Sequence, residues 1–109
     1  MKVLLNLLIA TLFAVGTALL VFFFWHAEVL LSISLFLSSV FYAYYMKSKR
    51  LVALYSFGFV FGPATEILAI RAGAWSYAEP SFFGIPLWLP FLWGSATLLL
   101  VSMYRILKG

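Results

Sequence analysis

The sequence predicts an all-α polytopic membrane protein with four transmembrane helices. Of its 109 residues, 66% are hydrophobic and only 9% are charged, a composition far from that of soluble globular proteins. The length accommodates four apolar segments, because a helix needs about 20 residues to cross the ~30 Å hydrocarbon core of a bilayer. Little is left over for a separate soluble domain, so residues 1–109 are expected to form one membrane domain.

The first predicted span covers residues 3–25. Its apolar run continues to Trp25 without the polar break of a signal-peptide cleavage region, so it is expected to remain as a helix. The second span covers residues 29–46 and ends in several tyrosines. A basic cluster follows these tyrosines, as is typical of a membrane–water boundary: Lys47, Lys49 and Arg50.

The third predicted span covers residues 51–70. The fourth begins somewhere between residues 82 and 87 and ends near Tyr104. Pro86 suits the first turn of this helix, whereas Pro90 removes a backbone donor inside it and is expected to produce a kink.

Four spans sort the charged residues by side of the membrane. One side receives both termini, the second loop and six basic residues: Lys2, Lys47, Lys49, Arg50, Arg105 and Lys108. The other side receives Arg71 together with Glu28 and Glu79. Because basic residues are retained in the cytoplasm, both termini are expected there, in the inner membrane of a bacterium or archaeon. This topological pattern also argues against a nucleic-acid partner, which would need basic residues gathered on one face.

The third span carries the most informative spacing in the chain. Gly58, Gly62 and Glu66 recur every four residues and therefore share one arc of a helix. The two glycines form a G-x-x-x-G pattern that permits close packing of a neighbouring helix. Glu66 is therefore expected to point into the bundle rather than toward lipid, where its charge would be strongly penalised.

Two readings of Glu66 remain open on the sequence alone. As a functional group, it is a candidate catalytic acid, because removal from bulk water favours the neutral form of a carboxyl group. Arg71, Trp75 and Tyr77 would then be the substrate-binding residues. Trp75 and Tyr77 could line a binding pocket, and Arg71 could pair with Glu66 or with Glu79, or extend toward lipid headgroups. As a structural group, Glu66 simply bonds a serine or tyrosine of another span, and the aromatics belong to the interfacial belt.

Other polar residues give weaker signals. His26 and Glu28 follow the first span and could join Glu66 in an acid–base group, but solvation is the simpler reading of an interfacial histidine. No metal site is predicted, because the chain has no cysteine and no metal-ligand spacing. A second group of polar residues is expected to form hydrogen bonds between helices: Asn6, Ser32, Ser34, Ser38 and Ser39.

The stretch EILAIRAGAWSY at residues 66–77, followed by GIPLWLP at residues 84–90, resembles small membrane proteins of carotenoid biosynthesis. The lycopene cyclase domain family and the related carotenoid hydratases share this order of acid, glycine, aromatics and a proline-bearing span. The resemblance covers about residues 65–93. It implies that Glu66 is the membrane acid, that Trp75 and Tyr77 are the aromatic pair, and that Gly84 and Pro86 begin the last helix.

The chain departs from this pattern after Pro90. The cyclases carry one or two acids there, whereas this chain has Phe91, Leu92 and Trp93. The favoured interpretation is therefore a non-catalytic subunit or an isoprenoid-binding protein that packs against a larger membrane protein or a second copy, with lipid or a carotenoid as the possible bound molecule. A cyclase- or hydratase-type enzyme with Glu66 as its acid is the alternative, so enzymatic activity stays open. A small proton-coupled transporter is a further alternative, although the strong charge bias argues against dual orientation.

Overall fold

The protein folds into four long helices, described here from a computed structural model that covers residues 2–47 and 49–108. The helices are α1 (Lys2–Phe24), α2 (Glu28–Met46), α3 (Arg50–Arg71) and α4 (Leu89–Lys108). All four are long and apolar enough to cross a membrane. The predicted fold class is therefore confirmed, and the first three helices begin and end within one residue of their expected bounds.

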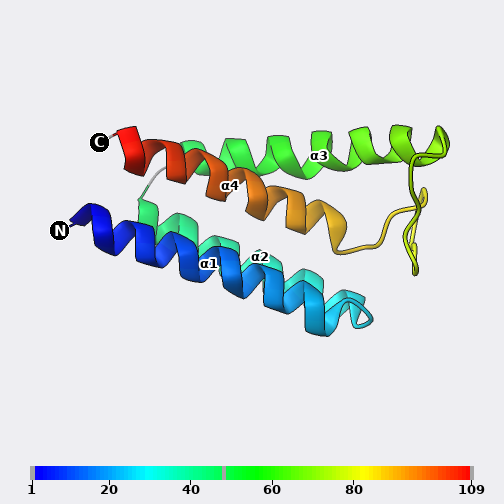
Figure 1. The fold of residues 1–109 in the computed structure, drawn as a ribbon, viewed down its shortest axis with the longest axis horizontal. Helices are drawn as coiled ribbons and strands as arrows, with labels where there is room; N and C mark the ends of the chain where they lie inside the picture. Colours follow the sequence, from blue (N-terminus) through cyan, green and yellow to red (C-terminus); the bar gives the residue numbers. More distant parts are fainter. Residues whose placement is uncertain (1, 48, 109) are drawn as a thin grey trace.

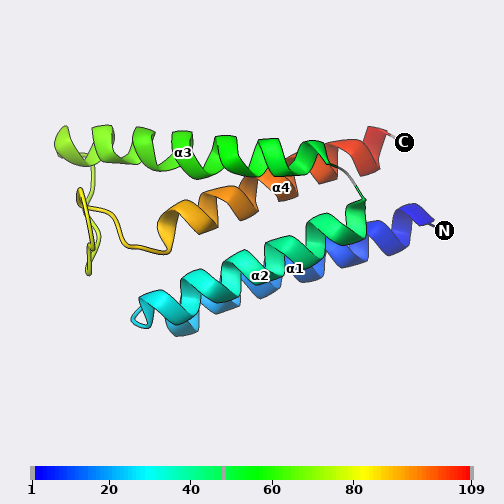
Figure 2. The ribbon, with the colours of Figure 1, turned by 180° about the vertical axis from the view of Figure 1, so that it is seen from behind.

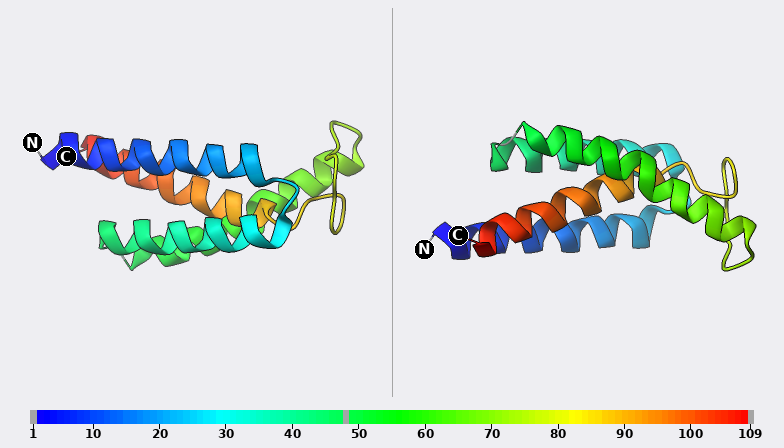
Figure 3. Two further views of the ribbon diagram at one scale, coloured as in Figure 1. Left: turned by 90° about the horizontal axis from the view of Figure 1, so that it is seen from below. Right: turned by 90° about the horizontal axis from the view of Figure 1, so that it is seen from above.

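Helix α4 lies at the centre of the bundle and packs against each of the other three helices. Figure 1 shows α3 on one side of α4, with the pair α1 and α2 on the other side. The view from behind gives the same order (Figure 2). Helix α3 packs chiefly on α4 and moves away from α1 and α2 toward the loop that precedes α4 (Figure 1). Seen from below and from above, α3 runs obliquely to α4 (Figure 3).

The two ends of the bundle differ in charge. Lys2 and Lys108 lie at the same end, next to the turn between α2 and α3, and we call this the basic end (Figure 1). The opposite end, which we call the loop end, carries the long connection between α3 and α4 and all three acidic side chains of the chain: Glu28, Glu66 and Glu79. The long axis measures 46 Å, which matches the ~40–45 Å thickness of a bilayer with its headgroups.

The start of α4 was predicted wrongly. The helix begins at Leu89, so Pro86 lies before it and Pro90 lies in its first turn. The backbone N–H of a first-turn residue has no intrahelical acceptor, so proline, which lacks this N–H, is tolerated there. Pro90 is therefore accommodated at the start of α4 rather than inside it. The apolar residues before it belong instead to a folded loop, in which Phe82 and Ile85 form an isolated antiparallel bridge.

Buried polar pairs join α2 to α4 along their shared surface. The hydroxyls of Ser39 and Ser95 lie 2.7 Å apart, and Tyr42 and Ser102 form a second buried hydroxyl pair toward the basic end. Ser39 therefore bonds between helices as predicted. Ser38 does not, because its hydroxyl donates to the Leu35 carbonyl of its own helix at 3.0 Å.

Candidate functional site

Glu66 lies on the face of α3 that packs against α4, and only 8% of the residue is exposed. The Tyr77 hydroxyl donates to one carboxylate oxygen, and the Trp93 indole Nε1–H donates to the other. An ionised carboxylate can only accept hydrogen bonds, whereas an indole N–H can only donate. Both oxygens of Glu66 are therefore engaged by donors, one from the loop and one from α4.

Glycines on α3 make this contact possible. A Cβ atom at Gly62 would lie 2.1 to 2.5 Å from ring atoms of Trp93, and one at Gly58 would lie 2.0 Å from the Thr97 hydroxyl oxygen. The G-x-x-x-G face thus lies directly against α4, where any larger residue would push the two helices apart. The indole of Trp93 rests on Gly62 with its N–H directed at Glu66, one turn further along α3.

The loop brings Tyr77 back to α3. Gly73, with φ +85°, ends α3 in the left-handed conformation that glycine tolerates best, and its N–H donates to the Ile70 carbonyl at 3.0 Å. The Tyr77 ring then meets Trp88 edge-on, with centroids 6.3 Å apart. Burial raises the pKa of Tyr77, and the neighbouring Glu66 carboxylate raises this pKa further, so the phenol keeps the proton that it donates.

The other residues proposed for this site lie elsewhere. Trp75 is 49% exposed, and Arg71 is exposed in the last turn of α3. Among the residues that the structure describes, Arg71 forms no ion pair with either acid, because Glu66 bonds to Tyr77 and Trp93 while Glu79 bonds to a histidine. Of the polar and aromatic residues predicted around Glu66, the structure therefore brings only Tyr77 to its carboxylate.

The two remaining acids make contacts between the loop and the residues at the start of α2. His26 Nδ1 lies 3.2 Å from a carboxylate oxygen of Glu79, and both side chains are more than half exposed. Glu28 accepts hydrogen bonds from the Ser81 hydroxyl and, at 3.5 Å, from the Leu87 backbone N–H. The predicted group of His26, Glu28 and Glu66 does not form, since each bonds separately to its own partners. Within residues 2–47 and 49–108, no cluster of acids and histidines is arranged to hold a metal ion.

An apolar groove between α2 and α3 is a second candidate site, which the sequence did not predict. It has a volume of about 1030 Å³. Aromatic and aliphatic side chains from both helices line it, with Leu98 of α4 also contributing; among them are Phe36, Val40, Tyr55, Phe59 and Val60. Lys47 and Lys49 lie at its basic end. The groove could not be found by periodicity alone, because its existence depends on α3 packing on α4 rather than on α2.

Comparison with known proteins identifies no relative of this chain. No family model, no curated protein and no solved structure matches the chain.

Proposed function

We propose that this chain is a small non-catalytic membrane protein that holds a long apolar molecule, of the isoprenoid or carotenoid class, in the groove between α2 and α3. The observation that carries the non-catalytic part is the pair of hydrogen bonds that Glu66 accepts from Tyr77 and Trp93. In this proposal Glu66 fastens the loop and α4 to α3, and it takes no part in proton transfer.

A general acid must present a proton within hydrogen-bond reach of its substrate. Each oxygen of Glu66 instead receives a proton donor from the protein, and neither the groove nor its lining includes Glu66. The stretch after Pro90, where the cyclases carry acids, is Phe91, Leu92 and Trp93 here, and Trp93 is one of those two donors. These contacts favour binding over the enzymatic alternative.

The groove supplies the binding part of the proposal. Its volume of about 1030 Å³ lies at the upper end of ordinary ligand sites, which are mostly apolar and span about 300–1,000 Å³. Its rim residues Val40, Val52 and Val60 are 47%, 65% and 58% exposed, so a chain dissolved in the bilayer has direct access. The isoprenoid class comes from the resemblance of residues 65–93 to proteins of carotenoid biosynthesis.

The proposed setting is the inner membrane of a bacterium or archaeon, with the basic end in the cytoplasm. Six of the seven Lys and Arg residues lie at this end and all three acids at the other. Retention of basic residues on the cytoplasmic side then places both termini inside.

Purification in a mild detergent tests the proposal directly. We expect an isoprenoid or carotenoid to co-purify, detectable by absorbance and by mass spectrometry of the extracted lipid. Val40→Trp should exclude this molecule by filling the groove, whereas Leu37→Trp should retain it. The two positions are matched, because both lie on α2 and are 47% and 49% exposed, but only Val40 lines the groove. Equal ligand occupancy in the two variants, or no apolar ligand in the native protein, would refute the proposal.

A second candidate role, as the accessory subunit of a larger membrane complex or of a homo-oligomer, is favoured by helix α1. Of its 23 residues, only Ala10 and Thr17 are buried. Among the residues that the structure describes, Gly16 has no contact within 4 Å of the position that a Cβ would occupy, so a helix from another chain could approach closely there. Cross-linking from Gly16→Cys, in a chain without other cysteines, would identify such a neighbour, and the absence of any cross-linked product would exclude this face.

A further inference from the structure

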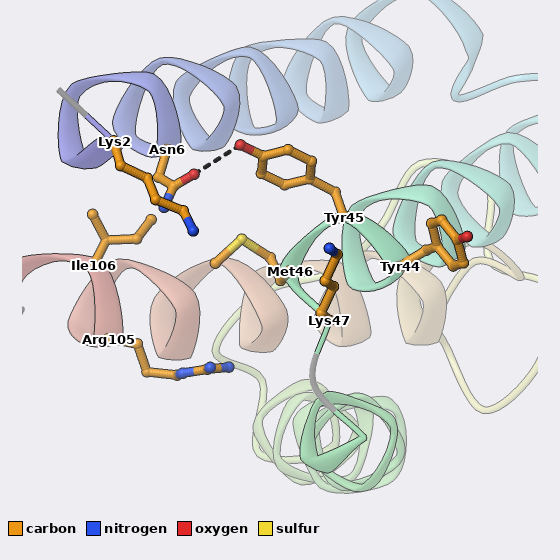
Figure 4. A pocket seen from close by; sticks show the side chains of 8 residues that line it. All are labelled: Lys2, Asn6, Tyr44, Tyr45, Met46, Lys47, Arg105 and Ile106. Carbon is orange, nitrogen blue, oxygen red and sulfur yellow. Dashed lines mark hydrogen bonds between the residues drawn. The ribbon is translucent and has the colours of Figure 1, made fainter.

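A second cavity lies at the basic end of the bundle, between α1, α2 and α4. It encloses about 690 Å³, and we call it the basic cavity. Three cationic side chains line it: Lys2 of α1, Lys47 immediately after α2, and Arg105 of α4 (Figure 4). No acidic side chain faces them, because the three glutamates of the chain all lie at the loop end.

This gathering of charge goes beyond what retention of basic residues in the cytoplasm requires. Membrane topology requires only that lysine and arginine residues lie on one side of the membrane. It does not require that they line the same cavity. Lys108 satisfies that requirement away from the cavity, with its ammonium 5.8 Å from the centre of the Tyr104 ring. Lys2, Lys47 and Arg105 instead line one hollow, where a bound anion would lower the repulsion between their charges.

Two structural features shape the basic cavity, namely a hydrogen bond that joins two of its helices and a lysine in a left-handed backbone conformation. The Tyr45 hydroxyl donates to the Asn6 side-chain oxygen at 2.7 Å, which links α2 to α1 and leaves the Asn6 amide group on the side of Lys2 (Figure 4). Lys47 ends α2 in the left-handed conformation, with φ 53° and ψ 46°. Glycine is the preferred residue at such a helix end, because a Cβ makes this conformation unfavourable. A lysine at this position is therefore less favourable for stability than glycine would be.

The basic cavity adjoins the apolar groove, since Tyr44 and Lys47 line both. From Lys47 the groove follows α2 back to Phe36. At ~1.5 Å of rise per residue this distance is about 16 Å, or about half of the ~30 Å hydrocarbon core. The combined site thus has a cationic compartment at the membrane surface and an apolar channel through one leaflet.

We propose that the basic cavity and the groove form one binding site for an isoprenoid lipid with a phosphate headgroup. The phosphate lies between Lys2, Lys47 and Arg105, and the chain lies between α2 and α3. Arginine offers paired N–H donors that fit phosphate oxygens, and lysine contributes a compact positive charge. This inference rests on the proposed function, to which it adds the charge and the position of the headgroup.

Titration of the purified protein in a neutral detergent, followed by native mass spectrometry, tests the inference with three probes: a polyprenyl monophosphate, the uncharged polyprenol of equal length, and inorganic phosphate. We expect the monophosphate to bind at least about tenfold more tightly than the polyprenol, because each hydrogen bond between charged groups contributes roughly a factor of ten or more. Inorganic phosphate should compete only weakly.

Equal affinities for monophosphate and polyprenol would overturn the headgroup inference and leave the proposed function intact. Failure of both isoprenoids to bind would refute the two together. Competition by inorganic phosphate at equal affinity would also overturn the inference, since the cavity would then serve a soluble anion.

Two double variants separate this site from general attraction to a basic surface. Lys47→Gln with Arg105→Gln should weaken monophosphate binding about a hundredfold. The control, Arg50→Gln with Lys108→Gln, removes the same charge from the same end, but neither residue lines the basic cavity or the groove. We expect its affinity to stay within about twofold of the native value, since charges that do not contact the lipid act on it only weakly through screening solvent. Equal losses in the two double variants would refute the inference.

The single variant Lys47→Gly adds a readout that a purely structural lysine could not give. Relief of the left-handed backbone should raise the unfolding temperature, while loss of the ammonium should weaken monophosphate binding and leave polyprenol binding unchanged. A more stable variant with native affinity for the monophosphate would show that Lys47 takes no part in binding.

Discussion

Replacement of Glu66 by glutamine tests whether this residue fastens the fold or transfers protons. The amide keeps the size of the side chain, and its carbonyl can still accept the Trp93 indole N–H while its NH₂ group faces the Tyr77 hydroxyl. Both contacts then persist as neutral hydrogen bonds. A hydrogen bond to a charged group contributes about 1.5–3 kcal/mol and a neutral one about 0.5–1.5 kcal/mol, so the two together lose roughly 2–3 kcal/mol. The lower cost of burying an amide offsets part of this loss, and we expect a net destabilisation of about 1–2 kcal/mol.

Equilibrium unfolding in mixed detergent micelles measures this difference in stability, and ligand titration of the folded variant measures binding. Glu66→Gln should lower the free energy of unfolding and leave the affinity for the isoprenoid unchanged. Glu79→Gln is the matched control, because Glu79 is also a glutamate of the loop end but its side chain is 52% exposed, and its pair with His26 contributes about 0–1 kcal/mol at most. A Glu66→Gln protein as stable as the native one would contradict the fastening role. Native stability with loss of a chemical conversion would instead establish Glu66 as an acid.

Three further substitutions have defined outcomes. Gly62→Ala should cost about 1–3 kcal/mol in an unfolding titration, because the added methyl group would overlap the facing indole, whereas Gly16→Ala should be close to neutral; equal effects would refute the close contact of α3 with α4. Tyr77→Phe should remove part of the pH dependence of stability: the raised pKa of Tyr77 means that its contribution is complete below pH 10 and is lost as the pH rises above 10, so unfolding temperatures of the two proteins should converge in that range. Parallel curves would show that the phenol does not titrate with folding. Tyr55→Phe should stabilise the protein by about 1 kcal/mol, because within the described residues the Tyr55 hydroxyl is buried without a hydrogen-bond partner; a loss of stability would reveal a partner for that hydroxyl.

The positions of the first three helices could be predicted because each apolar run is bounded by a clear polar signal. Lys47, Lys49 and Arg50 mark the turn between α2 and α3, for example. The start of α4 could not be predicted in the same way. Pro86 and Pro90 both suit a first helical turn, and the loop before them is itself apolar, so hydrophobicity alone did not separate loop from helix.

The candidate sites show a similar division. The spacing of Gly58, Gly62 and Glu66 predicted one shared face of α3, because helical periodicity is a local property. The partners of Glu66 were not predictable from spacing, since Tyr77 returns from a loop and Trp93 comes from another helix. The basic cavity also depends on how helices from distant parts of the chain pack, and the sequence only placed its cationic residues at one end.

The central position of α4 has a consequence for assembly in the membrane. Helices α1 and α2 pack on each other, but α3 packs chiefly on α4, which is the last of the four to leave the ribosome. Until α4 inserts, the glycine face of α3 therefore lacks its neighbouring helix, and among the described residues the Glu66 carboxylate has only Tyr77 as a hydrogen-bond donor. A nascent protein arrested before α4 would expose this close-packing glycine face and a partly paired carboxylate to the bilayer, where both are unfavourable.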